Sequence, residues 1–380
     1  MKNISIGPID LLIFQSTPFC NLDCKYCYLP SRNSTDKIDL KIIEKTLVNI
    51  IEEGLVKDEI DILWHAGEPL VMPISFYEEV ILIIKKCIPS SIKIRHQFQT
   101  NATLIDDEWC NFFIKENIEI GISLDGPKHI NDRNRLYRNQ KGSFDKILAG
   151  IGFLKKHKIE FSAIAVITDY SIDFPEEIYN FFMDIGVVSL GFNIDEEEGI
   201  NTKSTFNDSL QPKIKSFWRK IFQLQLNLNH FQNIREIRQF NNTLINTNLD
   251  RNAMPFGQMT QPLSILTIDT KGNFSTFSPE LLGMEDSRFN NFHFGNVNTN
   301  SFSSIVNNEN FLTIFQEISD GIQKCSNTCD YFSFCGGGAP SNKLYENGSF
   351  NSTETKYCKY GTKALVDVVL DELEDGLGIK

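Results

Sequence analysis

The sequence predicts an α/β protein: a partial (β/α)6 barrel followed by a smaller, cysteine-rich C-terminal domain. Apolar, β-branched runs of strand length alternate with amphipathic segments of helical length over residues 11–228, which is the pattern of parallel βα units. Six such units are fewer than the eight of a closed barrel, so we expect an open one. A second group of cysteines near the C-terminus marks the smaller domain.

The six units follow one another closely along the chain. The predicted strands span residues 11–17, 59–66, 92–100, 118–124, 160–168 and 187–194, and the predicted helices span residues 40–53, 76–86, 107–116, 144–156, 175–185 and 207–228. We assign residues 1–235 to the barrel, 236–262 to a polar linker or bridging region, and 263–380 to the C-terminal domain. Active sites of such barrels lie at the C-terminal ends of the strands, so the residues that follow each strand are the candidates.

Charge and apolar patterning exclude several classes of protein. The formal net charge is −12 and no basic run stands out, which argues against a nucleic-acid binder. No apolar run approaches the roughly 18 residues of a membrane span, and the first ten residues lack the features of a signal peptide. We therefore expect a cytoplasmic protein with a peptide or small-molecule substrate. In a reducing cytoplasm its clustered cysteines are better interpreted as metal ligands than as disulfides.

The first cysteine group, Cys20-x3-Cys24-x2-Cys27, directly follows the first predicted strand. Three thiolates at this spacing fit three corners of a [4Fe-4S] cube and leave one iron open. An open iron can bind the amino and carboxylate groups of S-adenosylmethionine and deliver the electron that releases a 5′-deoxyadenosyl radical. The alternative is a zinc knuckle that lacks one ligand.

Residues 20–27, CNLDCKYC, match the signature of the radical SAM family at every defining position, and the chain resembles that family. The resemblance implies that Glu68, in the segment Gly-Glu-Pro, faces the amino group of S-adenosylmethionine. It also implies that Ser123 and Arg135 hold the ribose and the carboxylate, with Arg133 or Arg138 as alternative carboxylate ligands. The expected cofactor-binding residues are Tyr26, Gly67, Glu68, Pro69, Asn101, Ser123, Asp125 and Arg135.

The second cysteine group provides four thiolates, enough to saturate one further cluster. It consists of Cys325, Cys329, Cys335 and Cys358. This arrangement resembles SPASM, the auxiliary-cluster domain of radical SAM enzymes that modify ribosomal peptides. Ala339 and either Phe277 or Ser278 stand where the full domain has further cysteines, so we expect one auxiliary [4Fe-4S] cluster and two clusters in all. A tetrahedral zinc site is the alternative.

Within the radical SAM family, the chain most resembles peptide maturases that form three-residue cyclophanes. The segments that carry this resemblance are residues 273–281, 335–343 and 346–355 and the acidic run 195–198. That resemblance implies a carbon–carbon bond between an aromatic ring and the β-carbon of a nearby residue. Such a reaction needs a base for the ring proton and an acceptor for one electron, and the auxiliary cluster is the expected acceptor. Candidate bases are Glu280, Asp269 and Glu354, each of which could instead be an ordinary surface or ion-paired carboxylate.

Two other reactions would use the same radical SAM cluster and auxiliary cluster. They are thioether formation and oxidation of a peptide or sulfatase side chain. A different class of protein, a non-catalytic peptide-binding module stabilised by iron–sulfur or zinc, would not need a cluster with an open iron. The expected partners are a ribosomal precursor peptide with a leader and an electron donor such as flavodoxin or ferredoxin.

Overall fold

The computed structural model of the chain describes residues 4–228, 234–245 and 257–377. One nine-stranded sheet forms its centre, in the order β6-β5-β4-β3-β2-β1-β7-β8-β9. All pairs from β6 to β7 in this order are parallel, whereas the pairs β7–β8 and β8–β9 are antiparallel. The strands are β1 Leu11–Phe14, β2 Glu59–Trp64, β3 Lys93–Thr100, β4 Ile118–Ser123, β5 Phe161–Ile167, β6 Ser189–Ile194, β7 Ile265–Ile268, β8 Asn273–Thr276 and β9 Gly295–Asn296.

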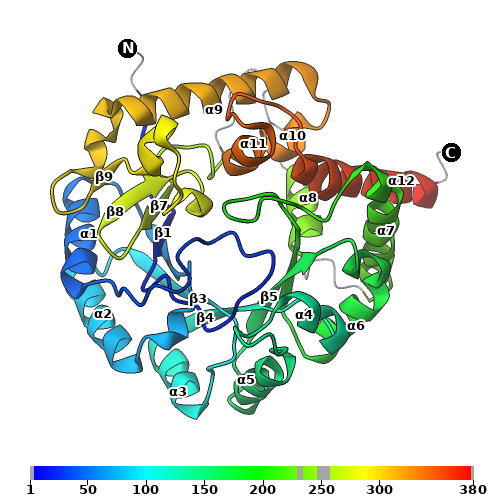
Figure 1. Cartoon of the computed structure of the whole chain (residues 1–380), viewed down its shortest axis with the longest axis horizontal. Coiled ribbons are helices and arrows are strands. Elements are labelled where there is room, and N and C mark those ends of the chain that lie inside the picture. Colours follow the sequence, from blue (N-terminus) through cyan, green and yellow to red (C-terminus); the bar gives the residue numbers. More distant parts are fainter. Residues whose placement is uncertain (1–3, 229–233, 246–256, 378–380) are drawn as a thin grey trace.

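The helices of the described residues are α1 Leu40–Glu52, α2 Ile74–Cys87, α3 Asp107–Glu116, α4 Lys128–Asn134, α5 Phe144–Lys156, α6 Pro175–Asp184, α7 Gln211–Leu228, α8 Arg235–Ile245, α9 Glu309–Thr328, α10 Phe332–Cys335, α11 Pro340–Asn347 and α12 Ala364–Leu377. Helices such as α1, α2, α3 and α5 cover the outer side of this sheet, whereas α10 and α11 lie further in (Figure 1). All six predicted βα units are present, so the predicted open barrel is confirmed. Within the ranges described above, no helix has the length and apolarity needed to cross a membrane.

Strand β5 shows how the sequence divides the two faces of the sheet. Its residues alternate between buried and partly exposed, because successive side chains of a strand point to opposite faces. Phe161, Ala163, Ala165 and Ile167 belong to the hydrophobic core. Ile164 and Val166, on the other face, line the central cavity. One face of the sheet thus packs in the hydrophobic core, and the other face lines the cavity.

The C-terminal part of the chain extends the barrel sheet. Strand β7 pairs with β1 in parallel, with Leu11 opposite Ile265, and the side chain of Ser264 donates to Asp10 at 2.6 Å. At the other end, α12 packs against α7, where Trp218 Nε1 donates to the carbonyl of Tyr360 at 3.0 Å. Helices α9 to α12 therefore lie across the gap between the two ends of the open sheet (Figure 1).

The predicted bounds differ from the structure mainly at the strand ends. Strand β1 ends at Phe14, three residues before the predicted end, because the chain turns there into the loop of the first cysteine group. Helix α4 was not predicted. The proposed linker 236–262 begins with helix α8, and its residues 246–256 lie outside the described residues. The division into a barrel and an auxiliary domain remains a prediction.

Candidate active site

A cavity of about 1190 Å³ opens at the C-terminal ends of the barrel strands. Both predicted cysteine groups line it, although about 300 residues separate them along the chain. The first group lies in the loop after β1, and the second comes from α9, α10 and the π-helical turn Cys358–Lys363 (η7). The lining cysteines are Cys20, Cys24, Cys27, Cys325, Cys329, Cys335 and Cys358, and none of them forms a disulfide.

Backbone and side-chain hydrogen bonds hold the first cysteine loop in place. Arg138 Nη2 donates to the carbonyl of Cys20 at 2.7 Å, and the amide of Asn101 lies 3.9 Å from Cys20 Sγ. Burial, reinforced by nearby negative groups, raises the pKa of Cys20 to about 12. Burial likewise raises the pKa of Cys24 to about 11. These thiols therefore need the positive charge of a bound metal to ionise near neutral pH.

The donor set fits an iron–sulfur cluster better than a single ion. Within the described part of the chain, no three Cys, His, Asp or Glu side chains stand close enough to hold one metal ion. A four-iron cluster spreads its thiolates further apart, because each thiolate binds a different iron. Cys20, Cys24 and Cys27, which all line the large cavity, match that requirement.

Glu68 is fixed at the cavity wall by the ends of β2 and β3. Its carboxylate accepts hydrogen bonds from Leu70 N at 3.0 Å, Thr100 Oγ1 at 2.7 Å and Asn101 N at 2.8 Å. Burial outweighs these bonds and raises the pKa of Glu68 to about 7. Gly67 has φ +136° and lies so near the first cysteine loop that a Cβ would stand 2.1 Å from a backbone oxygen. Glycine is required there.

Arg135 is anchored in a second buried group near the first cysteines. Its Nε donates to Asp125 Oδ1 at 3.0 Å, and the hydroxyl of Tyr26 donates to Asp125 Oδ2 at 2.5 Å. Burial alone would lower the pKa of Arg135, but Asp125 and other nearby groups raise it above its usual value. Asp125 thus positions Arg135, which lines the cavity as a fixed cation.

Most of the expected cofactor-binding residues reach the cavity. Those that line it are Tyr26, Gly67, Glu68, Asn101, Ser123 and Arg135. Pro69 and Asp125 stand behind this wall: Pro69 begins a short 3-10 helix and Asp125 holds its neighbours. Of the alternative carboxylate ligands, Arg133 stacks over the ring of Tyr170 and Arg138 binds the cysteine loop. Neither of the two lines the cavity.

The three candidate bases are placed very differently. Glu280 lines the cavity, and burial raises its pKa to about 7. Glu354 also lines the cavity but forms an ion pair with Lys363. Asp269 does not reach it, because its oxygens accept from Lys271 N and from the backbone and side chain of Asn273, each at 2.8 Å, in the β7–β8 turn. Of the three candidate bases, Glu280 is therefore the one that lines the cavity and has no cationic partner among the described ion pairs.

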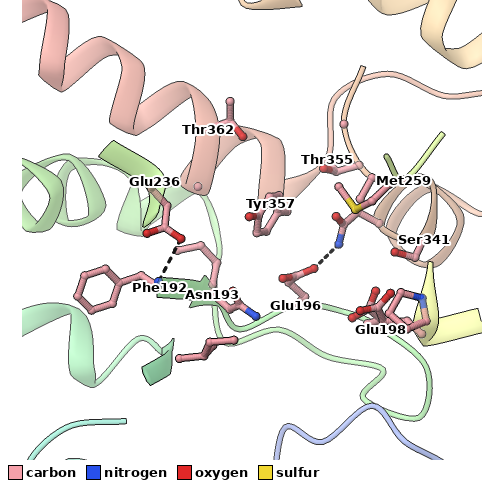
Figure 2. Close-up of a pocket in the computed structure, with 18 of the residues that line it drawn as sticks. Phe192, Asn193, Glu196, Glu198, Glu236, Met259, Ser341, Thr355, Tyr357 and Thr362 are labelled. Atoms are coloured by element: carbon pink, nitrogen blue, oxygen red, sulfur yellow. Dashed lines mark hydrogen bonds between the residues drawn. The ribbon is translucent and has the colours of Figure 1, made fainter. Parts of the chain in front are cut away.

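Two further glutamates, Glu196 and Glu198, belong to the loop after β6 and line the same cavity as Glu280. Figure 2 shows Glu196 and Glu198 near Ser341 and Tyr357, and Glu196 accepts from the side-chain amide of Asn342. Burial first, and neighbouring carboxylates second, raise the pKa of Glu196 to about 8 and that of Glu198 well above its usual value. The acidic run at residues 195–198 is evident in the sequence, but its position beside Glu280 is not. Its position after a barrel strand was the available signal.

Tyr28 and His65 were missed in the sequence analysis. The hydroxyl of Tyr28 lies 3.2 Å from His65 Nε2, and both residues line the cavity. Burial lowers the pKa of His65 to about 4, so the imidazole is neutral near pH 7. Tyr28 directly follows Cys27, and His65 directly follows β2, which ends two residues before the predicted strand end. Their positions could have identified them as candidates.

Comparisons with known proteins agree with this geometry. A family model of the radical SAM superfamily matches residues 14–182. The uncharacterized protein sll1766 of Synechocystis sp. is 40% identical over 99% of this chain and 94% of its own length. The serine-type anaerobic sulfatase-maturating enzyme of Bacteroides thetaiotaomicron is 36% identical, over 47% of this chain and 44% of that enzyme. The shared part is thus about half of that relative.

Two solved structures share the fold. Native anSMEcpe with bound AdoMet and Cp18Cys peptide superposes with a TM-score of 0.77 at 22% identity, over 98% of this chain and 99% of that chain. Streptococcus suis SuiB bound to the precursor peptide SuiA has a TM-score of 0.65 at 16% identity, over 94% and 77%. The family model over residues 14–182, together with the cysteine loop and its cavity, identifies the chain as a radical SAM enzyme, with S-adenosylmethionine and an iron–sulfur cluster as its cofactors.

Proposed function

We propose that this enzyme modifies a ribosomally synthesised precursor peptide by joining an aromatic ring carbon to the β-carbon of a nearby residue. One observation carries the proposal: a single cavity is lined by the first cysteine group, by Glu280 and by the second cysteine group. A crosslink of this kind requires a source of radicals, a base and an electron acceptor, and the three groups of residues match these requirements.

The reaction balances in atoms and electrons. When bound, S-adenosylmethionine supplies a 5′-deoxyadenosyl radical that takes one hydrogen atom from the peptide β-carbon. The resulting carbon radical adds to the aromatic ring. The ring carbon then loses its proton to a base and one electron to an acceptor, which restores aromaticity. The peptide loses two hydrogens in all. A protein such as flavodoxin or ferredoxin supplies the electron that cleaves S-adenosylmethionine and receives the electron that the ring releases.

Glu280 is the proposed base. A pKa of about 7, raised by burial, lets a carboxylate accept a proton near neutral pH and release it afterwards. Glu196 and Glu198 lie close enough for the charge of Glu280 to raise their pKa values as well. Asp269 is committed to its turn and Glu354 to Lys363, and we do not assign either of them this role.

Cys325, Cys329, Cys335 and Cys358 are proposed to hold the auxiliary [4Fe-4S] cluster. Burial raises the pKa of Cys358 to about 12, so this thiol also needs bound metal to ionise. Zinc would fit four thiolates as well, but zinc cannot accept the electron that the ring must lose.

The relatives also support a second candidate, oxidation of one side chain in a protein substrate, since they include sulfatase-maturating enzymes. A peptide substrate is compatible with both, because the structures of anSMEcpe and SuiB each contain a bound peptide. Side-chain oxidation would leave a new carbonyl and no link between residues.

The test is to incubate the reduced, iron-loaded enzyme with S-adenosylmethionine and the precursor peptide encoded next to its gene. We expect a product lighter by two hydrogens per crosslink, which resists fragmentation between the joined residues in tandem mass spectrometry. NMR should show a bond from a ring carbon to a β-carbon. A product that reacts with hydroxylamine would indicate side-chain oxidation, and a link through a cysteine sulfur would indicate a thioether; either would refute the cyclophane proposal.

A further inference from the structure

Lys343 is a buried lysine next to the second cysteine group. It lies in α11, is only 4% exposed and lines the cavity. Its Nζ donates to Cys325 Sγ at 3.6 Å. Among the described residues, no carboxylate forms an ion pair with it. A buried ammonium without an anionic partner is costly, so its position calls for a negative group at this point.

The surrounding chain makes room for this contact. Gly321 precedes Cys325 by one turn on the same face of α9. A Cβ on Gly321 would stand 3.2 Å from Lys343 Nζ and 2.4 Å from the carbonyl of Phe350. Any larger residue would therefore displace the ammonium or the neighbouring backbone. The lysine reaches Cys325 because α9 carries no side chain at that point.

We propose that Lys343 is a positioning residue that donates to the Cys325 sulfur and raises the reduction potential of the auxiliary cluster. This inference rests on the proposed function, in which those four cysteines hold the cluster. A four-iron core with four thiolate ligands is an anion, and reduction adds one more negative charge. A cation that donates to a ligand sulfur stabilises the reduced form more than the oxidised form, and such contacts are known to tune cluster potentials.

A raised potential suits the task proposed for the cluster, which is to take an electron from the cyclised peptide radical. Lys363 also lines the cavity with these cysteines, but it is already paired with Glu354. Lys343 differs from it because its charge has no carboxylate partner among the described ion pairs and is directed at a cluster ligand.

The experiment is an EPR-monitored redox titration of the full chain in which Cys20, Cys24 and Cys27 are replaced by alanine, so that only the auxiliary cluster contributes. Lys343→Met should lower the equilibrium constant for reduction about tenfold, which corresponds to about 59 mV for a one-electron couple. Lys343→Arg should keep most of the potential. Lys324→Met is the matched control, because it removes an equal charge from the exposed residue next to Cys325. Lys324 Nζ donates to the backbone oxygen of Asn351 at 3.3 Å and forms no ion pair among the described residues.

Iron analysis precedes each titration, and Lys343→Gln serves as the second neutral variant should Lys343→Met load poorly. A loaded cluster with the same potential in the neutral variant would overturn the role of Lys343 and leave the proposed function standing. An equal fall in Lys324→Met would also overturn it, because any nearby charge would then suffice. Zinc instead of iron in the parent variant would overturn the auxiliary cluster and, with it, this inference.

Discussion

Glu68→Gln keeps the shape of the side chain but removes its charge and turns one acceptor oxygen into a donor. In the structure three donors converge on the carboxylate, from Leu70, Thr100 and Asn101. Either orientation of the new amide leaves at least one of them facing its NH2 group. An unsatisfied buried donor costs about 1–3 kcal/mol of folding stability. Loss of the charged bond to the S-adenosylmethionine ammonium costs another 1.5–3 kcal/mol or so, which is roughly a ten- to hundredfold loss of affinity.

The pH dependence provides a sharper test than affinity alone. Burial raises the pKa of Glu68 from 4.5 to about 7 in the ligand-free fold. Protonated Glu68 therefore stabilises the ligand-free fold at low pH, and this contribution is lost as the pH rises through about 7. We predict that the ammonium of the cofactor binds the ionised form of Glu68. Affinity of the wild-type enzyme should consequently fall as the pH drops below the pKa, approaching tenfold per unit, whereas the variant should show little dependence.

Isothermal titration of the iron-loaded protein with S-adenosylmethionine at about pH 6, 7 and 8 measures both effects, because the range brackets the expected pKa. Urea unfolding of the same samples measures stability. Glu79→Gln, on the exposed face of α2, is the control and should change neither quantity. Equal affinity and equal pH dependence for Glu68→Gln and the wild type would show that Glu68 does not face the amino group.

Three further changes test the rest of the site. Anaerobically reconstituted protein should bind about eight irons in two four-iron clusters. The variant with alanines in the first cysteine group should keep about four irons and lose all cleavage of S-adenosylmethionine. An iron content unchanged by those alanines would contradict the assignment of the first cluster. Arg135→Met leaves Asp125 buried without its cation, so unfolding in urea should show a loss of about 3–5 kcal/mol, together with weaker cofactor binding in titration. Glu280→Gln should still cleave S-adenosylmethionine but form at least a hundredfold less crosslinked peptide by mass spectrometry, whereas Asp269→Asn should keep crosslinking activity; equal activities would rule out Glu280 as the base.

Local patterns in the sequence were enough to predict the barrel. Strands such as β5 consist of apolar residues that alternate between the buried core and the cavity face. Helices such as α3 carry their own boundary signals: Asp106 accepts from Trp109 N at 3.0 Å, and Asn117 ends the helix with φ +50°. The seven-residue α4 has too few turns to show a clear apolar period. The pairing of β7 with β1 depends on contacts far apart in the chain, which no local pattern reports.

The candidate site was predicted best where chemistry fixes the spacing of residues. The cysteine groups and Glu68 could be identified because their motifs are short and specific. Asp269 shows the limit of the strand-end rule, because it follows β7 on the correct side of the sheet, yet its oxygens serve the adjacent turn. Whether a carboxylate faces a cavity or its own backbone depends on side-chain direction. For the same reason, Glu196 and Glu198 could be noted as acidic but not placed beside Glu280.

Because β1 pairs with β7, the segments that carry the two cysteine groups must fold together. Asp10 and Ser264, which hydrogen-bond beside these strands, are 254 positions apart. Until the later strand arrives, one side of Leu11–Phe14 is an open edge with unpaired backbone groups, and apolar open edges promote aggregation. A fragment that ends before β7 would keep this edge permanently exposed. The strand that leads into the radical-generating loop is therefore completed only late in synthesis, so this enzyme should gain its cluster site and its solubility together.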